Sequence, residues 1–215
     1  MGVIQGAVRV PSLSASAGNT NLDALQGKAG DLVVSELHGK YFTQTYNGNT
    51  FIGSTTNAGV AIPADNATAM TFGVWNPVGS NRLLVPIHYR AGIVTLGTRV
   101  VSALGWAFVL NCGSGIATGS SITAFTETAP RNALIGAGVV STMKFGLAAT
   151  ITAVTNYLWM GLYHDLPGGG SAPALIMDFD GSLALLPGNA MFVISGDAAT
   201  GSTYAQSLVW AEVAL

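Results

Sequence analysis

Hydrophobic residues in this chain come in short runs, and clusters of Gly, Asn, Ser and Pro separate these runs. The runs are rich in Val, Ile, Thr, Tyr, Phe and Trp, which favour strands. No long stretch combines helical periodicity with good helix formers. We therefore expect an all-β chain with strands at residues 40–46, 71–75, 82–90, 93–101, 106–110, 121–126, 139–145, 150–162, 174–178, 190–194 and 208–213.

The residues between the runs are those that turns require. Asn76-Pro77, Asp180-Gly181 and Pro187-Gly188 are examples, and such pairs mark tight turns rather than long connections. Many short strands separated by turns are typical of a β-sandwich or a jelly roll. The sequence therefore predicts an all-β fold, a jelly-roll or β-sandwich.

The first part of the chain has a different character. A run of Ser, Gly and Asn follows Pro11, and strand-forming residues are sparse there. We expect residues 1–35 to form an N-terminal arm or a flexible terminus. Residues 36–215 are expected to form the jelly-roll β-sandwich domain.

Alternating side chains indicate which faces of two strands are buried. Along 82–90, we expect one face to carry Leu83, Val85, Ile87 and Tyr89. Pro86 has no N–H to donate to a neighbour, so this strand lies at a sheet edge or carries a bulge there.

The last predicted strand, 208–213, has two apolar faces. One face carries Leu208, Trp210 and Glu212, and the other carries Val209, Ala211 and Val213. This pattern indicates a sheet that is buried on one side and docked against another surface on the other.

Charge is the unusual feature of the composition. Asp, Glu, Lys and Arg make up 8% of the 215 residues, against roughly 25% in an ordinary globular protein. Few charges give little repulsion between molecules, and a surface of small residues suits close packing against other protein. We therefore expect a protein that assembles into a homo-oligomer, and the alternative is a small-residue sandwich with a neutral surface and no partner.

The same scarcity of charge argues against two classes of partner. The net charge is −2 and the eight Lys and Arg residues are scattered, whereas nucleic-acid binding needs clustered cations. No polybasic segment suggests a membrane surface. Neither a nucleic acid nor a membrane is expected as a partner.

Candidate chemical residues are few, and each has a simpler structural interpretation. The single Cys112 excludes an intrachain disulfide and is expected to be a buried, inert thiol. Asp178-Phe179-Asp180-Gly181 lacks the closing Glu of a calcium loop and is expected to form a hairpin turn into 182–186.

The histidines and tryptophans complete the list of candidates. His38, His88 and His164 lack metal-ligand spacing, and His164-Asp165 is expected to be a solvated loop pair. The sequence therefore predicts no enzyme, no catalytic residue, no cofactor and no metal. Core packing is the expected role of the tryptophans, with sugar stacking on an exposed one as the alternative; they are Trp75, Trp106, Trp159 and Trp210.

Several short segments carry a resemblance to a known group of proteins. Residues 36–51, from Glu36 to Phe51, resemble a segment of tailed-bacteriophage virion proteins. The Gly/Ala-rich stretch 57–62, the Asn-Pro turn and strand at 75–85, and the closing Trp210-Ala211-Glu212 follow in similar order. Jelly-roll capsid decoration (cement) proteins are the most similar members.

The resemblance implies a role in the virion. It suggests a homo-oligomer, with a trimer expected, that binds the phage major capsid protein on the capsid exterior, and no catalytic residue carries over. A tail-fibre or receptor-binding protein that recognises a host surface glycan is the alternative. An enzyme or lectin unrelated to virions is a third possibility, which would need a deep pocket with converging acids.

Overall fold

The structure is a computed structural model, and it describes residues 39–65, 67–95, 97, 102–110, 112, 122–151, 156–163, 175–196 and 202–215. The chain divides into two units, Met1–Phe42 and Thr43–Leu215. Most of the first unit lies outside the described residues, as does the expected arm at 1–35. The boundary between residues 35 and 36 therefore stays a prediction.

Residues 40–46, expected as a strand, contain a short helix instead. Helix α1 spans Phe42–Tyr46. Asn47 and Gly48 donate backbone hydrogen bonds to Thr43 and Thr45, and Gly48 has a φ of 72°. A glycine in this left-handed conformation ends a helix at low cost. The turn at Gly48 thus overrides the strand preference of the aromatic and β-branched residues before it.

The strands form two antiparallel sheets. The five-stranded sheet has the order β10-β4-β12-β1-β7. Its strands are β1 (Thr50–Ser54), β4 (Arg82–Thr95), β7 (Arg131–Asn132), β10 (Leu175–Asp178) and β12 (Thr203–Ala214).

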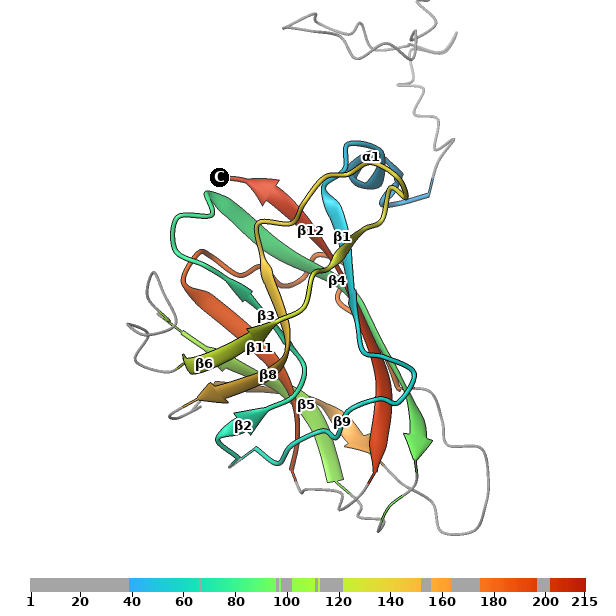
Figure 1. The fold of residues 1–215 in the computed structure, drawn as a ribbon, viewed down its shortest axis with the longest axis vertical. Helices are drawn as coiled ribbons and strands as arrows, with labels where there is room; N and C mark the ends of the chain where they lie inside the picture. Colours follow the sequence, from blue (N-terminus) through green and yellow to red (C-terminus); the bar gives the residue numbers. More distant parts are fainter. Residues whose placement is uncertain are drawn as a thin grey trace, which may run out of the picture. The chain divides into compact units, whose positions relative to one another are not determined.

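The other sheet has seven strands. Its main order is β2-β8-β3-β11-β5-β9, and β6 pairs with β8. Its strands are β2 (Ala69–Met70), β3 (Gly73–Asn76), β5 (Ser102–Val109), β6 (Ile122–Glu127), β8 (Lys144–Ile151), β9 (Asn156–Tyr163) and β11 (Asn189–Ser195). In Figure 1, β3, β8 and β11 face β1, β4 and β12 across the interior.

The order of the strands confirms the predicted jelly roll. The first strand, β1, pairs with the last, β12, and the chain passes from one sheet to the other between β1 and β3, β3 and β4, and β4 and β5. It passes between the sheets again after β9, β10 and β11. These connections wind two Greek keys into one sandwich. Strands β6, β7 and β8 come from an insertion between the paired neighbours β5 and β9.

The main core lies between the two sheets. Phe72 packs edge-on against Tyr89 and Phe145, and Tyr89 packs edge-on against Trp106. Burial and the nearby Tyr204 raise the pKa of the Tyr89 phenol far above its ordinary value. Tyr89 therefore stays protonated and donates a hydrogen bond of 2.9 Å to Gln206 Oε1.

A second core lies on the opposite face of the seven-stranded sheet. Along β11, Met191 and Val193 belong to the main core, while Ala190, Phe192 and Ile194 belong to the second. Phe125 of the inserted β6 packs edge-on against Trp75 and Phe192. The insertion therefore contributes to a core that buries this sheet on both faces.

Strand β4 carries the bulge that Pro86 predicts. On β12, Val209 pairs with His88 and Trp210 pairs with Pro86, so Ile87 has no partner on β12. The bulge reverses the alternation beyond this point. Leu84, Ile87 and Tyr89 are buried, while Leu83 and Val85 point outward. The expectation that Leu83 and Val85 share a face with Ile87 and Tyr89 is therefore wrong.

Other expectations for the strands also differ from the structure, since the expected strands 82–90 and 93–101 share the single strand β4 and the expected strand 150–162 includes parts of β8 and β9. Residues 139–143, expected as part of a strand, form a loop, and β8 begins at Lys144. Asp180 and Gly181 have positive φ values and form the expected tight turn, closed by the hydrogen bond from Ser182 N to Phe179 O. The segment after this turn makes a single bridge, between Leu185 and Leu84, rather than a strand.

Gly53 is required by the packing of the main core. A methyl group built on Gly53 would lie 2.5 Å from the Phe145 ring, whereas one built on Gly92 in β4 would meet nothing within 4 Å. We expect Gly53→Ala to lower the free energy of unfolding by about 1–3 kcal/mol because the core is overpacked. Gly92→Ala, the matched control, should be neutral or stabilising. Denaturant unfolding measures both, and equal effects would contradict this packing.

Candidate assembly surface

Within the described residues, the candidate chemical groups do not come together as a metal centre. No three His, Cys, Asp or Glu side chains within these ranges are grouped so that they could hold a metal ion. His88 lies on β4, and its backbone pairs with that of Asp178. His38, His164 and Asp165 lie outside the described residues.

Cys112 is buried, as its type and position predicted. Burial raises the pKa of its thiol to about 11, although backbone hydrogen bonds of Cys112 and Ala190 oppose the rise. The thiol lies 3.3 Å from the Val109 carbonyl oxygen, to which it donates. A protonated, buried thiol is a poor nucleophile.

The tryptophans divide into core and surface residues. Three of them are buried, as expected for core packing, namely Trp75, Trp106 and Trp210. Trp159 on β9 is 42% exposed. A half-exposed ring on an edge strand is therefore the one place among the described tryptophans where sugar stacking is sterically open.

Glu212 is a buried carboxylate at the end of β12, with 1% of its surface exposed. It accepts hydrogen bonds from Ser141 Oγ (2.5 Å), Thr142 Oγ1 (2.6 Å) and Thr142 N (3.1 Å). The indole N–H of Trp210 lies 3.4 Å from the same carboxylate. Strand alternation predicts that Glu212 points inward beside Trp210, but its partners are far away in sequence and no local pattern identifies them.

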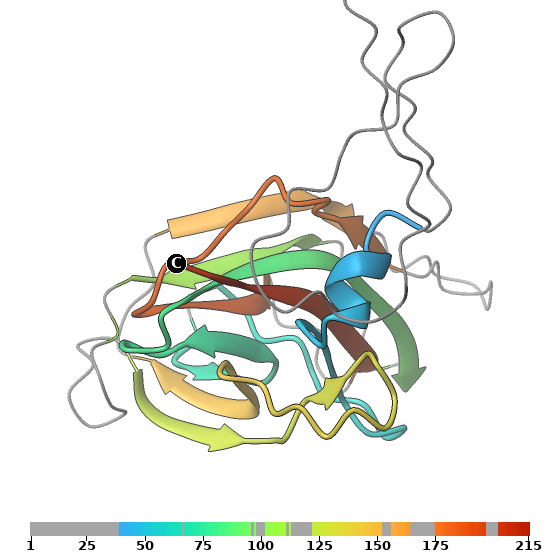
Figure 2. The same ribbon diagram turned by 90° about the horizontal axis from the view of Figure 1, so that it is seen from above.

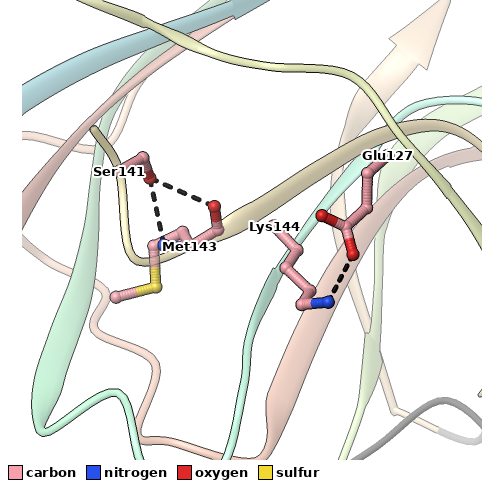
Figure 3. Close-up of polar contacts among 4 residues, drawn as sticks. All are labelled: Glu127, Ser141, Met143 and Lys144. Atoms are coloured by element: carbon pink, nitrogen blue, oxygen red, sulfur yellow. Dashed lines mark hydrogen bonds and ion pairs between the residues drawn. The ribbon is translucent and has the colours of Figure 1, made fainter.

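The segment held by Glu212 is further braced by its own polar groups. Ser141 Oγ, whose single proton is donated to Glu212, accepts from the Met143 amide (3.0 Å) and lies 3.1 Å from the Met143 carbonyl oxygen (Figure 3). Lys144 pairs with Glu127 in the same view, and its ammonium lies 5.5 Å from the centre of the Trp75 ring. These contacts tie the start of β8 to β6 and to the second core.

Residues 133–140, here called the apolar loop, precede this braced segment. Its sequence, Ala-Leu-Ile-Gly-Ala-Gly-Val-Val, contains no side chain that can form a hydrogen bond. Ile135 and Val140 are 83% and 82% exposed. The two glycines have positive φ values, which explains why a run rich in strand-forming residues makes a loop instead.

Hydrogen bonds fix the apolar loop at its first end as well. Asn132 Nδ2 donates to the Gly48 carbonyl (2.7 Å), and Ala133 N donates to the Thr50 carbonyl (2.8 Å). From above, the chain after β7 lies beside the start of β1 (Figure 2). The loop therefore presents exposed apolar side chains between two anchored ends.

The five-stranded sheet has an apolar surface on the side away from the main core. Ile52 pairs with Val209, Val85 with Ala211, and Leu83 with Val213, all on the outward side of the strands. We call this surface the outer apolar face, and its residues are Ile52, Leu83, Val85, Val209 and Val213. Val209 and Val213 point away from the core, as the alternation along 208–213 predicted.

An apolar pocket lies near the start of β11. Its volume is about 330 Å³, and it is lined by Phe108, Leu110, Leu183, Ala184, Leu185, Leu186 and Asn189. Leu110 and Leu186 are also among the exposed hydrophobic residues. The lining contains no acid or histidine, so the pocket offers no acid–base chemistry.

Comparisons with known proteins found no relative of this chain. No family model matches the chain, and no curated protein and no solved structure matches it. In the described part of the chain, no helix has the length and apolar character needed to cross a membrane. The class of protein is therefore defined by the fold alone, as an all-β jelly-roll sandwich.

We expect Glu212→Gln to lower the free energy of unfolding by about 1–3 kcal/mol. A carboxylate has two acceptor oxygens, whereas an amide has one, and the NH₂ group of the glutamine would face groups of Ser141 or Thr142 that are themselves hydrogen-bond donors. Glu127→Gln is the matched control. That substitution removes a half-exposed ion pair with Lys144 and should change stability by less than about 1 kcal/mol. Denaturant unfolding of both variants checks this, and a larger loss for the control would refute the role given to Glu212.

Proposed function

We propose that this chain is a non-enzymatic structural protein of a bacteriophage particle, a capsid decoration (cement) protein that binds the outside of the capsid and stabilises it as an oligomer. The observation that carries the proposal is the outer apolar face. The outward face of a sandwich sheet normally carries polar residues. Here the half of that face toward the end of β12 carries Ile, Leu and Val, while the other half carries polar residues such as Ser54 and Ser207. A surface of this kind favours contact with other protein.

The low charge of the chain supports the same proposal. Each square ångström of apolar surface removed from water contributes about 25 cal/mol before the costs of association. One subunit binding through one such face gains little, but a shell repeats the contact many times and an oligomer links several contacts together. The jelly roll is a fold of capsid proteins as well as of lectins and cupins, so it is compatible with the proposal without deciding it.

A substitution on the outer apolar face tests the proposal. We expect Val213→Asp to weaken binding to capsids that lack this chain by ten-fold or more, because an unpaired carboxylate would be buried at the contact. Ala205→Asp is the control, since Ala205 is an exposed residue on the same strand and lies at the far end from Val213. Cosedimentation with purified particles measures both variants. Equal binding by the two, or wild-type chain found at the tail alone, would overturn the capsid assignment.

Trp159 favours a second candidate, a receptor-binding protein of the virion that recognises a host surface glycan. Its ring is 42% exposed on β9, and exposed indoles stack on apolar faces of sugars through the same surface that packs in cores. For this function we expect Trp159→Ala to abolish glycan-array binding and to reduce phage adsorption to cells. An array without hits, together with unchanged adsorption, would remove this candidate.

A further inference from the structure

The apolar loop and the apolar pocket lie at the end of the sandwich where β1 and β4 begin and β12 ends, and hydrogen bonds and short backbone segments link them. Near the pocket, Asn76 Nδ2 donates to the Leu185 and Arg82 carbonyls (both 2.9 Å). Leu215 N donates to the Asn81 carbonyl (3.1 Å), which links the end of β12 to the start of β4. Glu212 then connects β12 to the segment after the loop. Both features are therefore held by the same framework.

Among the residues that the structure describes, the exposed side chains of the loop fill no pocket. Ile135 and Val140 are more than four-fifths exposed. The loop that carries them contains no charged side chain whose hydration would offset this exposure of apolar surface. The pocket volume of about 330 Å³ is near the lower limit of small-molecule sites, roughly 300 Å³. Such a pocket has room for a protruding aliphatic side chain, and its apolar lining matches that side chain in chemistry.

The exposed charges next to the loop and next to the pocket differ in sign. Arg131, which is exposed, lies just before the loop. Asp178 and Asp180, both exposed, precede the Leu183–Leu186 wall of the pocket. The half-buried Arg82 lies near both features, since its Nη1 is 3.4 Å from Asn49 Oδ1 and its carbonyl accepts from Asn76 beside the pocket. A contact between loop and pocket therefore brings Arg131 toward Asp178 and Asp180, and a contact between two loops brings two copies of Arg131 together.

We propose that the apolar loop of one copy docks into the apolar pocket of a second copy of this chain, with Ile135 as the inserted side chain. This inference deepens the proposed function by naming the contact that makes the oligomer. The two surfaces differ, so the contact is heterologous, and repetition closes a ring in which every copy uses both its loop and its pocket. An eight-residue loop and a small pocket bury less than the roughly 800 Å² per partner of a stable interface. The ring is therefore stable because each copy is held twice.

Two variants in combination test the heterologous contact. Ile135→Asp disables the loop and leaves the pocket intact, while Leu186→Asp disables the pocket and leaves the loop intact. Both side chains are exposed, so both variants should fold, and thermal unfolding checks this. Each variant alone should be monomeric in sedimentation velocity at every concentration. An equal mixture should form one-to-one dimers at high concentration, because one working loop meets one working pocket, and these singly held dimers should dissociate at concentrations at which the wild-type ring persists. Val94→Asp, an exposed apolar residue elsewhere on β4, should keep the wild-type oligomer.

A cross-linking experiment gives the size of the ring. In the double variant Ile135→Cys/Leu186→Cys, a short bismaleimide should link copies covalently into a closed oligomer, and the buried Cys112 should not react. Each single-cysteine variant should remain a chain without cross-links. Cross-linking within the Ile135→Cys variant alone would show a loop-to-loop contact and overturn the proposal, as would a mixture of the two Asp variants that stays monomeric.

Failure of this contact and failure of the proposed function give different results. If capsid binding depends on Val213 but the Asp variants oligomerise like the wild type, the loop-and-pocket contact is wrong and the function stands. If the mixture and cross-linking results hold but no particle binds the chain, the contact stands and the capsid role is wrong.

Discussion

The hydrogen bonding of the buried Glu212 carboxylate is the interaction on which the exposed surfaces of the molecule depend. Removing a carboxylate from water costs several kcal/mol unless other donors replace the lost hydration. Ser141 and Thr142 supply these donors, so the segment after the apolar loop must lie against the end of β12. The loop is then ordered when the chain folds. Apolar side chains presented on an ordered loop lose less entropy on association than the same residues on a disordered one.

The two sheets expose different surfaces for a related reason. The insertion between β5 and β9 adds Phe125 and Ile122 to a second core, so the outer side of the seven-stranded sheet is buried within the chain itself over β3, β5, β8 and β11. The five-stranded sheet gains two residues of β7 from that insertion, and its outer apolar face retains partly exposed Leu and Val side chains. The outer apolar face and the end that carries the loop and the pocket are therefore among the described surfaces available to a partner.

The sequence predicted the fold class because that depends on local patterns. Strand-forming runs, the Asp180-Gly181 turn and the missing N–H of Pro86 each act within a few residues, and the sandwich, the turn and the bulge follow from them. Helix α1 was missed because the conformation of Gly48 outweighs residue preference. The second core was missed although the unbroken apolar run along β11 was its signal, since strands buried on both faces lose their alternation. The partners of Glu212 could not be predicted because about 70 residues separate them and no pattern marks the pairing.

Scarcity of charge explains why shape must carry the specificity of any assembly that this chain forms. Charged surfaces accelerate encounters and exclude wrong partners, and a chain with 8% charged residues has little of either effect. A flat apolar face alone would bind many surfaces weakly. In the proposed contact, a protruding loop and a pocket of limited volume would restrict which surfaces fit. Because such subunits carry few charges, free subunits repel one another only weakly. Covering their apolar surfaces with a specific partner would therefore be what prevents non-specific association.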